Sequence, residues 1–170
     1  MNIVELIIFL LPAYLANSIP VVLGGGMPLD FRKTMDDGER ILGDGKTIRG
    51  FVAGVAAGTF IAGVITLLWP LSFFASAQMQ FLGGTATAFG AMAGDAFGSF
   101  AKRRIKFKPG QPFFPDTFLF IVFALIFVFP FISTKFYDIY NIAFCIGLTL
   151  IMHPLFNIIA NKAGLKRVPW

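Results

Sequence analysis

The sequence is poor in charge, in cysteine and in histidine. Charged residues make up 14% of its 170 positions, whereas a soluble domain carries about 25%. One cysteine excludes an intrachain disulfide, and one cysteine with one histidine excludes the metal sites that these two residue types build. Because His153 lies in an apolar segment, a nucleophile–histidine triad is not expected. Cys145 lies in the same segment, where packing is its expected role.

Apolar residues dominate what is present, and they gather in long runs. Hydrophobic residues account for 56% of the chain, and its mean hydropathy is +0.77. Because a membrane-spanning helix needs about 20 mostly apolar residues, the sequence predicts an all-α integral membrane protein that forms a single domain over 1–170. We expect five transmembrane helices, at residues 3–23, 50–74, 81–97, 117–132 and 141–160.

Cationic residues are distributed unevenly between the segments that join these helices. All but one of the 14 Lys and Arg residues lie in two loops, 24–49 and 98–116, or after residue 160. Cytoplasmic segments of membrane proteins carry such an excess, so we expect two functional cytoplasmic loops, a cytoplasmic C-terminus and an N-terminus outside. The same rule accounts for the net charge of +5 without a nucleic-acid partner. The sequence therefore predicts a multi-pass cell-membrane protein with its site on the cytoplasmic side.

The second loop places cations between two carboxylates. Asp95 stands at the end of the third apolar run and Asp116 at the start of the fourth. An ionisable residue in such a place is costly and points to function. If the third helix continues, Asp95, Ser99 and Lys102 share one of its faces. The alternatives are an ion pair of Asp95 with Lys102 or Arg103, and helix N-capping by Asp116.

The first loop contains the fragment GDGKT. Glycines on both sides of Asp44 permit a tight turn. Lys46, Thr47 and Arg49 then supply hydrogen-bond donors before a helix N-terminus, which favours anions. A complete P-loop is not present, because Arg40 stands where its first glycine would be. We therefore expect either a phosphate-binding turn or an ordinary solvated, cationic loop.

Small and polar residues mark particular helix faces. Glycine or alanine recurs every four residues over 50–62 and 86–98, which is typical of close packing between membrane helices, and we expect these two helices to pack on each other. Asn17, in the first helix, is expected either to face a cavity or to bond another helix. His153 and Asn157 lie on one face of the fifth helix and are weaker candidates for the site.

Cations flanked by carboxylates at a membrane surface suit group transfer at a phosphorus centre. A polyphosphate carries dense negative charge, which Lys, Arg and Mg²⁺ offset in the transition state. Carboxylates are the usual protein ligands of Mg²⁺. Asp95 and Asp116 are therefore the expected ligands of a Mg²⁺ cofactor.

Short motifs in both loops resemble a known family. Three of them resemble the signature of the CTP-dependent phosphatidate cytidylyltransferases: Ser99-Phe-Ala-Lys102-Arg103, Lys108-Pro-Gly and Pro115-Asp116. The fragment GDGKTIRG is more similar to their shorter archaeal relatives, the CDP-archaeol synthases, and the resemblance covers nearly the whole chain. It implies that CTP and an unsaturated ether-lipid phosphate, 2,3-bis-O-geranylgeranyl-sn-glycerol 1-phosphate, give CDP-archaeol and pyrophosphate with Mg²⁺.

The resemblance also implies roles for individual residues. Asp95, Asp116 and Lys102 would be catalytic, with the two aspartates holding Mg²⁺. Nucleotide or phosphate binding is implied for a wider set: Asp44, Lys46, Thr47, Arg49, Ser99, Arg103, Lys108 and Asn17. His153 and Asn157 would line the same cavity. The family signature leads us to expect a second carboxylate three residues after Asp116, where this chain has Leu119, so either Asp95 supplies the other ligand or the match at this end is shifted.

Two other functions remain open at this point. A small transporter or channel subunit would need ionisable groups near the bilayer midplane, where this sequence places only Asn and His side chains. A lipid or polyprenol kinase would use similar loops but would release a nucleoside diphosphate instead of pyrophosphate. A homodimer is also left open.

Overall fold

The described part of the chain forms five α-helices. The computed structural model describes residues 2–107, 111, 113–166 and 168–169, and in these residues there is no β-strand, only three isolated bridges. The elements in chain order are α1 Ile3–Leu23, α2 Ile48–Leu68, α3 Ala77–Arg104, α4 Asp116–Val128, two 3₁₀ turns at Phe129–Phe131 and Thr134–Tyr137, and α5 Ile139–Lys162. The prediction of an all-α fold is confirmed.

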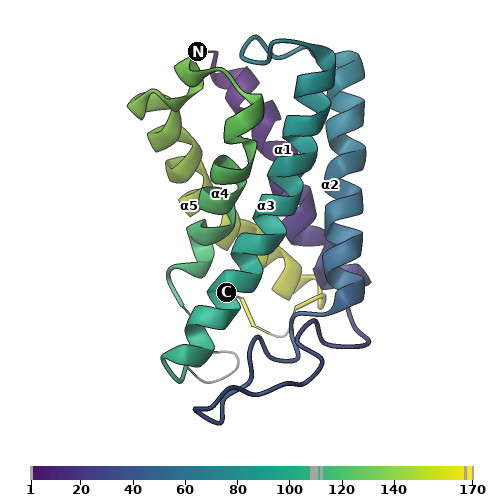
Figure 1. Ribbon diagram of the computed structural model, residues 1–170, viewed down its shortest axis with the longest axis vertical. Helices are drawn as coiled ribbons and strands as arrows, with labels where there is room; N and C mark the ends of the chain where they lie inside the picture. Colours follow the sequence, from purple (N-terminus) through teal and green to yellow (C-terminus); the bar gives the residue numbers. More distant parts are fainter. Residues whose placement is uncertain (1, 108–110, 112, 167, 170) are drawn as a thin grey trace.

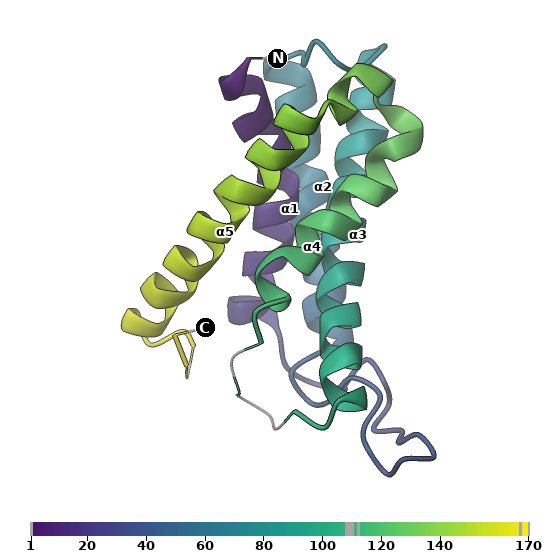
Figure 2. The same ribbon diagram turned by 90° about the vertical axis from the view of Figure 1, so that its left-hand side faces the viewer.

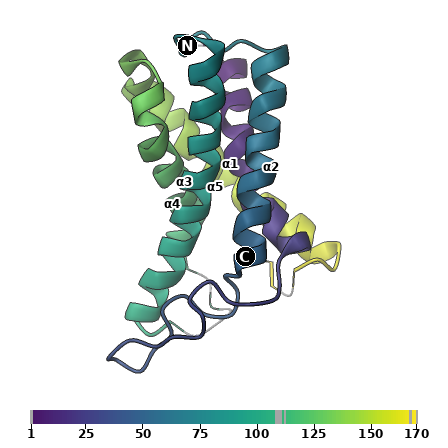
Figure 3. The ribbon, with the colours of Figure 1, turned by 45° about the vertical axis from the view of Figure 1, so that its right-hand side comes forward.

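The cation-rich segments gather at one end of the bundle. The C-terminal ends of α1, α3 and α5 and the N-terminal ends of α2 and α4 all lie there, with the α1–α2 loop (Figure 1). Figure 3 shows that this loop runs from the end of α1 across to the end of α3. The two loops that the sequence singled out therefore meet in space, although they lie far apart in the chain.

The helix bounds differ from the predicted ranges mainly around α3. α2 ends at Leu68, before Trp69-Pro70, and α3 begins at Ala77 behind the capping hydroxyl of Ser76, which accepts a hydrogen bond from the Met79 amide. α3 continues to Arg104 instead of ending at 97. The prediction ended this helix at 97 because the apolar run ends there. Basic residues in a last helical turn interact favourably with the helix dipole, so the Lys-Arg-Arg run is compatible with a longer helix.

Three of the described helices are long and apolar enough to cross a membrane, namely α1, α2 and α5. α4 and the 3₁₀ turn after it form a shorter apolar helix, Asp116–Phe131. α3 is the longest helix, with 28 residues, but it carries Asp95 and three cations toward the loop end. The chain is therefore a membrane protein, and most of its cations lie at one end of the bundle.

The small-residue stripe of α3 packs against α4. A Cβ atom added at Gly94 would lie 2.6 Å from the carbonyl oxygen of Leu119, and one added at Gly98 would lie 2.7 Å from Oδ1 of Asp116. The expectation that α2 and α3 pack on each other is confirmed, since Gly58 of α2 faces Ala88 of α3, but Gly90, Gly94 and Gly98 face α4 instead of α2. Periodicity shows that a face is smooth but not which neighbour occupies it. The close approach of α4 brings Asp116 beside α3.

The stripe of α2 packs against α1 and α3 together. A Cβ atom added at Gly54 would lie 2.6 Å from the carbonyl oxygen of Ala16 in α1 and 2.7 Å from Sδ of Met92 in α3. Gly58 is similarly close to the Pro12 carbonyl and to Ala88. α1, α2 and α3 thus form a tight unit on which the loop is carried.

α5 diverges from this unit toward the loop end (Figure 2). Its buried residues, Asn141, Cys145 and Thr149, all lie in its first half. Thr149 is hydrogen bonded to the Tyr14 hydroxyl of α1 at 3.0 Å. The second half of α5 therefore stands partly apart from the other helices, and two cavities lie along it.

Candidate functional site

A cavity of about 700 Å³ lies at the loop end of the bundle. Its walls come from the α1–α2 loop, the last turns of α3, the start of α4, the second half of α5 and the C-terminal residues. The predicted site residues that line it are Asp44, Lys46, Asp95, Ser99, Lys102, Arg103, Asp116, His153 and Asn157. The α1–α2 loop, α3 and α4 thus bring charged groups to one space, to which α5 adds His153 and Asn157.

Two ion pairs join these segments across the cavity wall. Lys46 Nζ lies 2.6 Å from Asp95 Oδ2, and Lys102 Nζ lies 2.5 Å from Asp116 Oδ2. The side chains are 19–29% exposed, so each pair is partly open to the cavity. The first pair fixes the loop to α3, and the second fixes α3 to α4.

The structure shows which partners the two carboxylates have. Asp95 is paired with Lys46 of the other loop, and not with Lys102 or Arg103 of its own helix. α4 has Pro115 at its N-cap with no side-chain cap hydrogen bond among the described residues. Asp116 is therefore directed to Lys102 and does not act as a helix cap.

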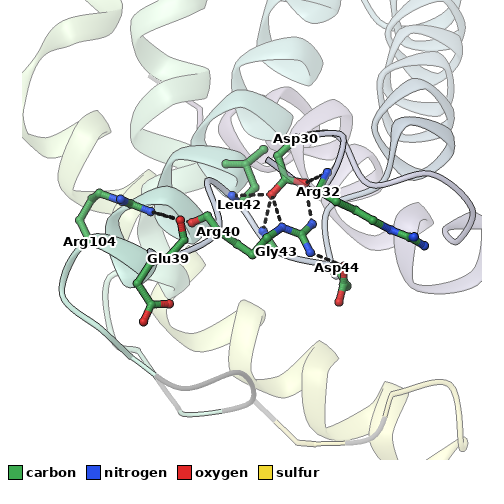
Figure 4. Close-up of polar contacts among 8 residues, drawn as sticks. All are labelled: Asp30, Arg32, Glu39, Arg40, Leu42, Gly43, Asp44 and Arg104. Atoms are coloured by element: carbon green, nitrogen blue, oxygen red, sulfur yellow. Dashed lines mark hydrogen bonds and ion pairs between the residues drawn. The ribbon is translucent and has the colours of Figure 1, made fainter. Parts of the chain in front are cut away.

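The Gly43–Lys46 turn is held in place by a buried carboxylate, Asp30. The Asp30 side chain is fully buried and pairs with Arg40, with Nη2 at 2.6 Å from Oδ1 (Figure 4). Its Oδ2 atom also accepts hydrogen bonds from the backbone amides of Leu42 and Gly43, both at 3.0 Å. Asp30 thus fixes the backbone that immediately precedes Asp44 and Lys46.

The electrostatics of Asp30 follow from these contacts. Burial raises the pKa of the Asp30 carboxyl, but hydrogen bonds from Arg40 and from the amides of Gly43, Leu42 and Arg32 outweigh burial and hold this pKa below its ordinary value. Asp30 was not among the predicted site residues. Its only signal in the sequence was an acidic residue in a cationic loop, which does not distinguish it from Asp36 or Asp37.

Arg40 holds the loop together internally, and Arg104 joins the loop to α3. Arg40 Nη1 lies 2.9 Å from Oδ1 of Asp44. Arg104 donates from Nη2 to the Arg40 carbonyl oxygen at 2.6 Å, and from Nη1 to Oδ2 of Asp37 at 2.6 Å. The end of α3 therefore holds both the loop backbone and one of its acidic side chains (Figure 4 shows the backbone contact).

Three predicted residues that the structure describes, Thr47, Asn17 and Arg49, do not line this cavity. Thr47 is buried and caps α2, since its hydroxyl accepts hydrogen bonds from the Gly50 amide at 3.1 Å and the Gly25 amide at 3.2 Å. It borders a smaller neighbouring cavity of about 250 Å³. Asn17 faces an apolar cavity, and Arg49 is exposed. Lys108 lies outside the residues that the structure describes.

The C-terminal segment contributes a cation that the sequence had not singled out. The chain turns after α5 through Gly164, whose φ is 71°, and returns so that Lys166 Nζ donates to Asn157 Oδ1 at 2.9 Å. The Asn161 side chain donates to the Lys166 carbonyl oxygen at 2.8 Å. Lys166 lines the cavity. Burial, and then the charge of Lys46, lower the pKa of Lys166.

A second, apolar cavity of about 540 Å³ lies between α1 and α5. It is lined mainly by aliphatic and aromatic side chains, with Asn17 and Ser18 on the α1 side. His153 and Asn157 line both this cavity and the polar one. The two cavities therefore adjoin at this point of α5.

The residues of the polar cavity fit a Mg²⁺ ion that is bound together with a polyphosphate. No group of three His, Cys, Asp or Glu side chains that could hold a metal occurs among the described residues. Asp95 and Asp116 nevertheless face one cavity from adjacent helices. Mg²⁺ is usually held by one or two carboxylates together with substrate phosphates and water, and this pair of oxygen donors meets that requirement.

Comparisons with known proteins agree on one family. A family model described as CarS-like, CDP-archaeol synthase, matches residues 1–170. The CDP-archaeol synthases of Pyrococcus furiosus and Archaeoglobus fulgidus are 40% and 42% identical to this chain, and each alignment covers 99% of it and 98% of the relative. A solved structure of an intramembrane enzyme for archaeal membrane lipids biosynthesis has a TM-score of 0.81 and 37% identity, and the match covers 92% of this chain and 95% of that one.

Proposed function

The chain belongs to the CDP-archaeol synthase family and is a CTP-dependent nucleotidyltransferase of membrane-lipid biosynthesis, and from this premise we propose that the polar cavity is its active site. CTP and a lipid phosphate, the unsaturated ether lipid 2,3-bis-O-geranylgeranyl-sn-glycerol 1-phosphate, meet there and leave as CDP-archaeol and pyrophosphate. One observation carries the proposal. Two ion pairs face the same cavity. One joins Lys46 of the α1–α2 loop to Asp95 of α3, and the other joins Lys102 of α3 to Asp116 of α4.

The cations of the cavity bind the triphosphate. Lys46 comes from the turn of the α1–α2 loop, and Lys102 and Arg103 come from the last turns of α3. Nε of Arg103 is buried and has no hydrogen-bond partner among the described residues, so its guanidinium retains donors for a phosphate. Ser99, one turn before Arg103, offers a hydroxyl to the same group. Asp44 is 80% exposed and paired with Arg40, so its part is to shape the turn.

Asp95 and Asp116 hold Mg²⁺, which when bound would offset the charge that develops on the pyrophosphate leaving group. The nucleophile needs no general base, because a phosphate monoester is largely dianionic near neutral pH. One of its oxygens forms a bond to the α-phosphorus of CTP, and the bond from that phosphorus to the bridging oxygen of the β-phosphate breaks. The work of this chain is to align the two phosphates and to compensate their charge.

The apolar cavity accommodates hydrocarbon chains of the lipid. It runs along α1 and α5 and adjoins the polar cavity at His153 and Asn157. A lipid whose chains lie there can present its phosphate to the polar cavity without leaving the bilayer. We also propose that α3 and α4 complete a five-span topology in which the cation-rich end, and therefore the active site, faces the cytoplasm.

The direct test is an assay of the purified full-length protein with CTP, Mg²⁺ and an ether-lipid phosphate. CDP-lipid and pyrophosphate are expected in equal amounts, and chelation of Mg²⁺ should abolish both. Release of CDP with a phosphorylated lipid would identify a kinase instead. Parallel reactions with ATP, GTP and UTP measure the base preference. Absence of CDP-lipid under all of these conditions would overturn the assignment of this cavity as a cytidylyltransferase site.

A further inference from the structure

The polar cavity and the apolar cavity share one boundary, on α5. His153 and Asn157 line both cavities. A lipid phosphate whose chains occupy the apolar cavity would therefore enter the polar cavity beside these residues. The cation placed at this boundary is Lys166, whose Nζ is hydrogen bonded to Asn157 Oδ1 at 2.9 Å.

The cations of the polar cavity differ in their charge partners. Lys46 and Lys102 are each paired with an aspartate. Within the described residues, Arg103 and Lys166 line the cavity without an ion pair. Arg103 lies on α3, whereas Lys166 lies on the segment that returns from α5. The cavity thus has an uncompensated positive charge on each of two walls.

We propose that Lys166 binds the phosphate of the lipid substrate, a role that rests on the function proposed above. An ammonium group has three N–H donors, and the amide oxygen of Asn157 takes one of them. The other N–H groups are available to phosphate oxygens. Asn157 is then a positioning residue, because it orients the ammonium group toward the boundary between the cavities.

The geometry of the reaction favours separate binding groups for the lipid phosphate and the triphosphate. In-line transfer at phosphorus requires the attacking oxygen and the leaving oxygen on opposite sides of the reacting centre. Lys46, Lys102 and Arg103 come from the loop and α3, and Lys166 comes from the α5 side. A triphosphate held by the first three groups leaves the α5 side for the nucleophile. The partly buried ammonium of Lys166 forms no ion pair within the described residues, so a lipid phosphate would be its first direct anionic partner.

The first test separates the two substrates kinetically. Lys166→Ala should raise the KM for the ether-lipid phosphate by about tenfold or more, because a charge-assisted hydrogen bond is lost, while the KM for CTP changes less than about twofold. Lys166→Arg should recover part of the affinity. Lys162→Ala is the matched control, since Lys162 is exposed at the end of α5 and does not line the cavity within the described residues. An unchanged KM for the lipid, or a matching rise in the KM for CTP, would overturn the proposal.

The second test uses the wild-type protein and does not depend on turnover. Acetylation of Lys166 by acetic anhydride is followed by mass spectrometry, with Lys162 as the internal reference. A short-chain glycerol ether phosphate should protect Lys166, whereas CTP and an equal concentration of inorganic phosphate should protect it far less. Equal protection by inorganic phosphate would show a general anion site and would contradict the lipid assignment, as would protection by CTP alone.

The two proposals fail separately. If the wild-type protein forms no CDP-lipid but the lipid phosphate still protects Lys166, the proposed function is wrong and the lipid-phosphate site stands. If the wild-type protein is active and neither test singles out Lys166, the lipid-phosphate site is wrong and the proposed function stands.

Discussion

Removal of the Asp30 carboxylate should lower activity indirectly, because Asp30 holds the turn that carries Lys46 and does not itself line the polar cavity within the described residues. This carboxylate accepts five hydrogen bonds, two from Arg40 and three from backbone amides. Asp30→Ala leaves the partly buried Arg40 guanidinium with only the exposed Asp44 as its partner, and removal of one member of a buried ion pair typically costs about 3–5 kcal/mol. Because the Arg40 side chain is 24% exposed, we take the lower end, about 3 kcal/mol, which corresponds to about a 100-fold change in an equilibrium constant.

The loss of this free energy should disorder the Gly43–Lys46 turn. It should not disturb the helices, since α1, α2 and α3 do not depend on Asp30 for their packing. A turn that is disordered part of the time presents Lys46 correctly only in the remaining fraction. We therefore expect kcat/KM for CTP to fall by about 10- to 100-fold, while the helical content and the melting temperature of the bundle change little. The assay is pyrophosphate release at varied CTP with saturating lipid phosphate, combined with circular dichroism.

Asp36→Ala is the matched control for this prediction. Asp36 lies in the same loop and is exposed, and no hydrogen bond or ion pair of its side chain occurs among the described residues. Its removal makes the same change in net charge, so the control separates position from charge. If Asp30→Ala and Asp36→Ala have the same kcat/KM for CTP, the role assigned to the Asp30 network is wrong.

The pH dependence of the same network has a definite sign. The pKa of Asp30 is lowered in the folded protein, so its contribution to stability is fully present above the unfolded pKa, about 3.9, and is lost as pH falls through the lower folded value. The activity ratio of wild type to Asp30→Asn should therefore stay constant between pH 5 and pH 8. A ratio that approaches one toward pH 5 would show that the carboxyl is protonated in that range, against the expected direction.

Three further substitutions test the ion pairs and the helix packing. Asp95→Asn should abolish Mg²⁺-dependent formation of CDP-lipid while the protein still inserts and folds. Full activity of this variant would show that Asp95 is not part of the site. Lys46→Ala should raise the KM for CTP by about tenfold or more, and an unchanged KM would refute its phosphate role. Gly94→Ala places a Cβ atom 2.6 Å from the Leu119 carbonyl oxygen and should destabilise the protein by about 1–3 kcal/mol, whereas Gly147→Ala, with nothing within 4 Å, should not lower the melting temperature.

The sequence predicted the helices well because apolar runs of membrane length leave few alternatives. α1 has the predicted bounds, and α5 differs by two residues at each end. α3 was predicted too short because its last turns carry Lys102, Arg103 and Arg104, which a hydropathy count assigns to a loop. Part of its glycine stripe meets α4 instead of α2, since spacing along a helix contains no information about the partner that meets it.

The candidate site was predictable in its residue types but not in its connections. GDGKT, Asp95 and Asp116 were recognised from local sequence and resemblance, and the structure places Asp44, Lys46, Asp95 and Asp116 around one cavity. The pairing of Asp95 with Lys46 spans 49 residues of sequence, and no short-range rule indicates it. Lys166 was counted only as a cytoplasmic cation, because its place in the cavity depends on how the chain turns after α5.

The two ion pairs of the cavity explain how one set of residues can serve both a metal and a triphosphate in the proposed reaction. Ion pairs that are open to solvent contribute only about 0–1 kcal/mol, and the Lys46–Asp95 and Lys102–Asp116 pairs are partly open to the cavity. A triphosphate offers each ammonium group a more highly charged partner than an aspartate does. Transfer of the two lysines to phosphate oxygens leaves both carboxylates free to act as Mg²⁺ ligands. The ion pairs therefore keep the carboxylates and ammonium groups in register across three segments of the chain, at a strength that substrate binding can overcome.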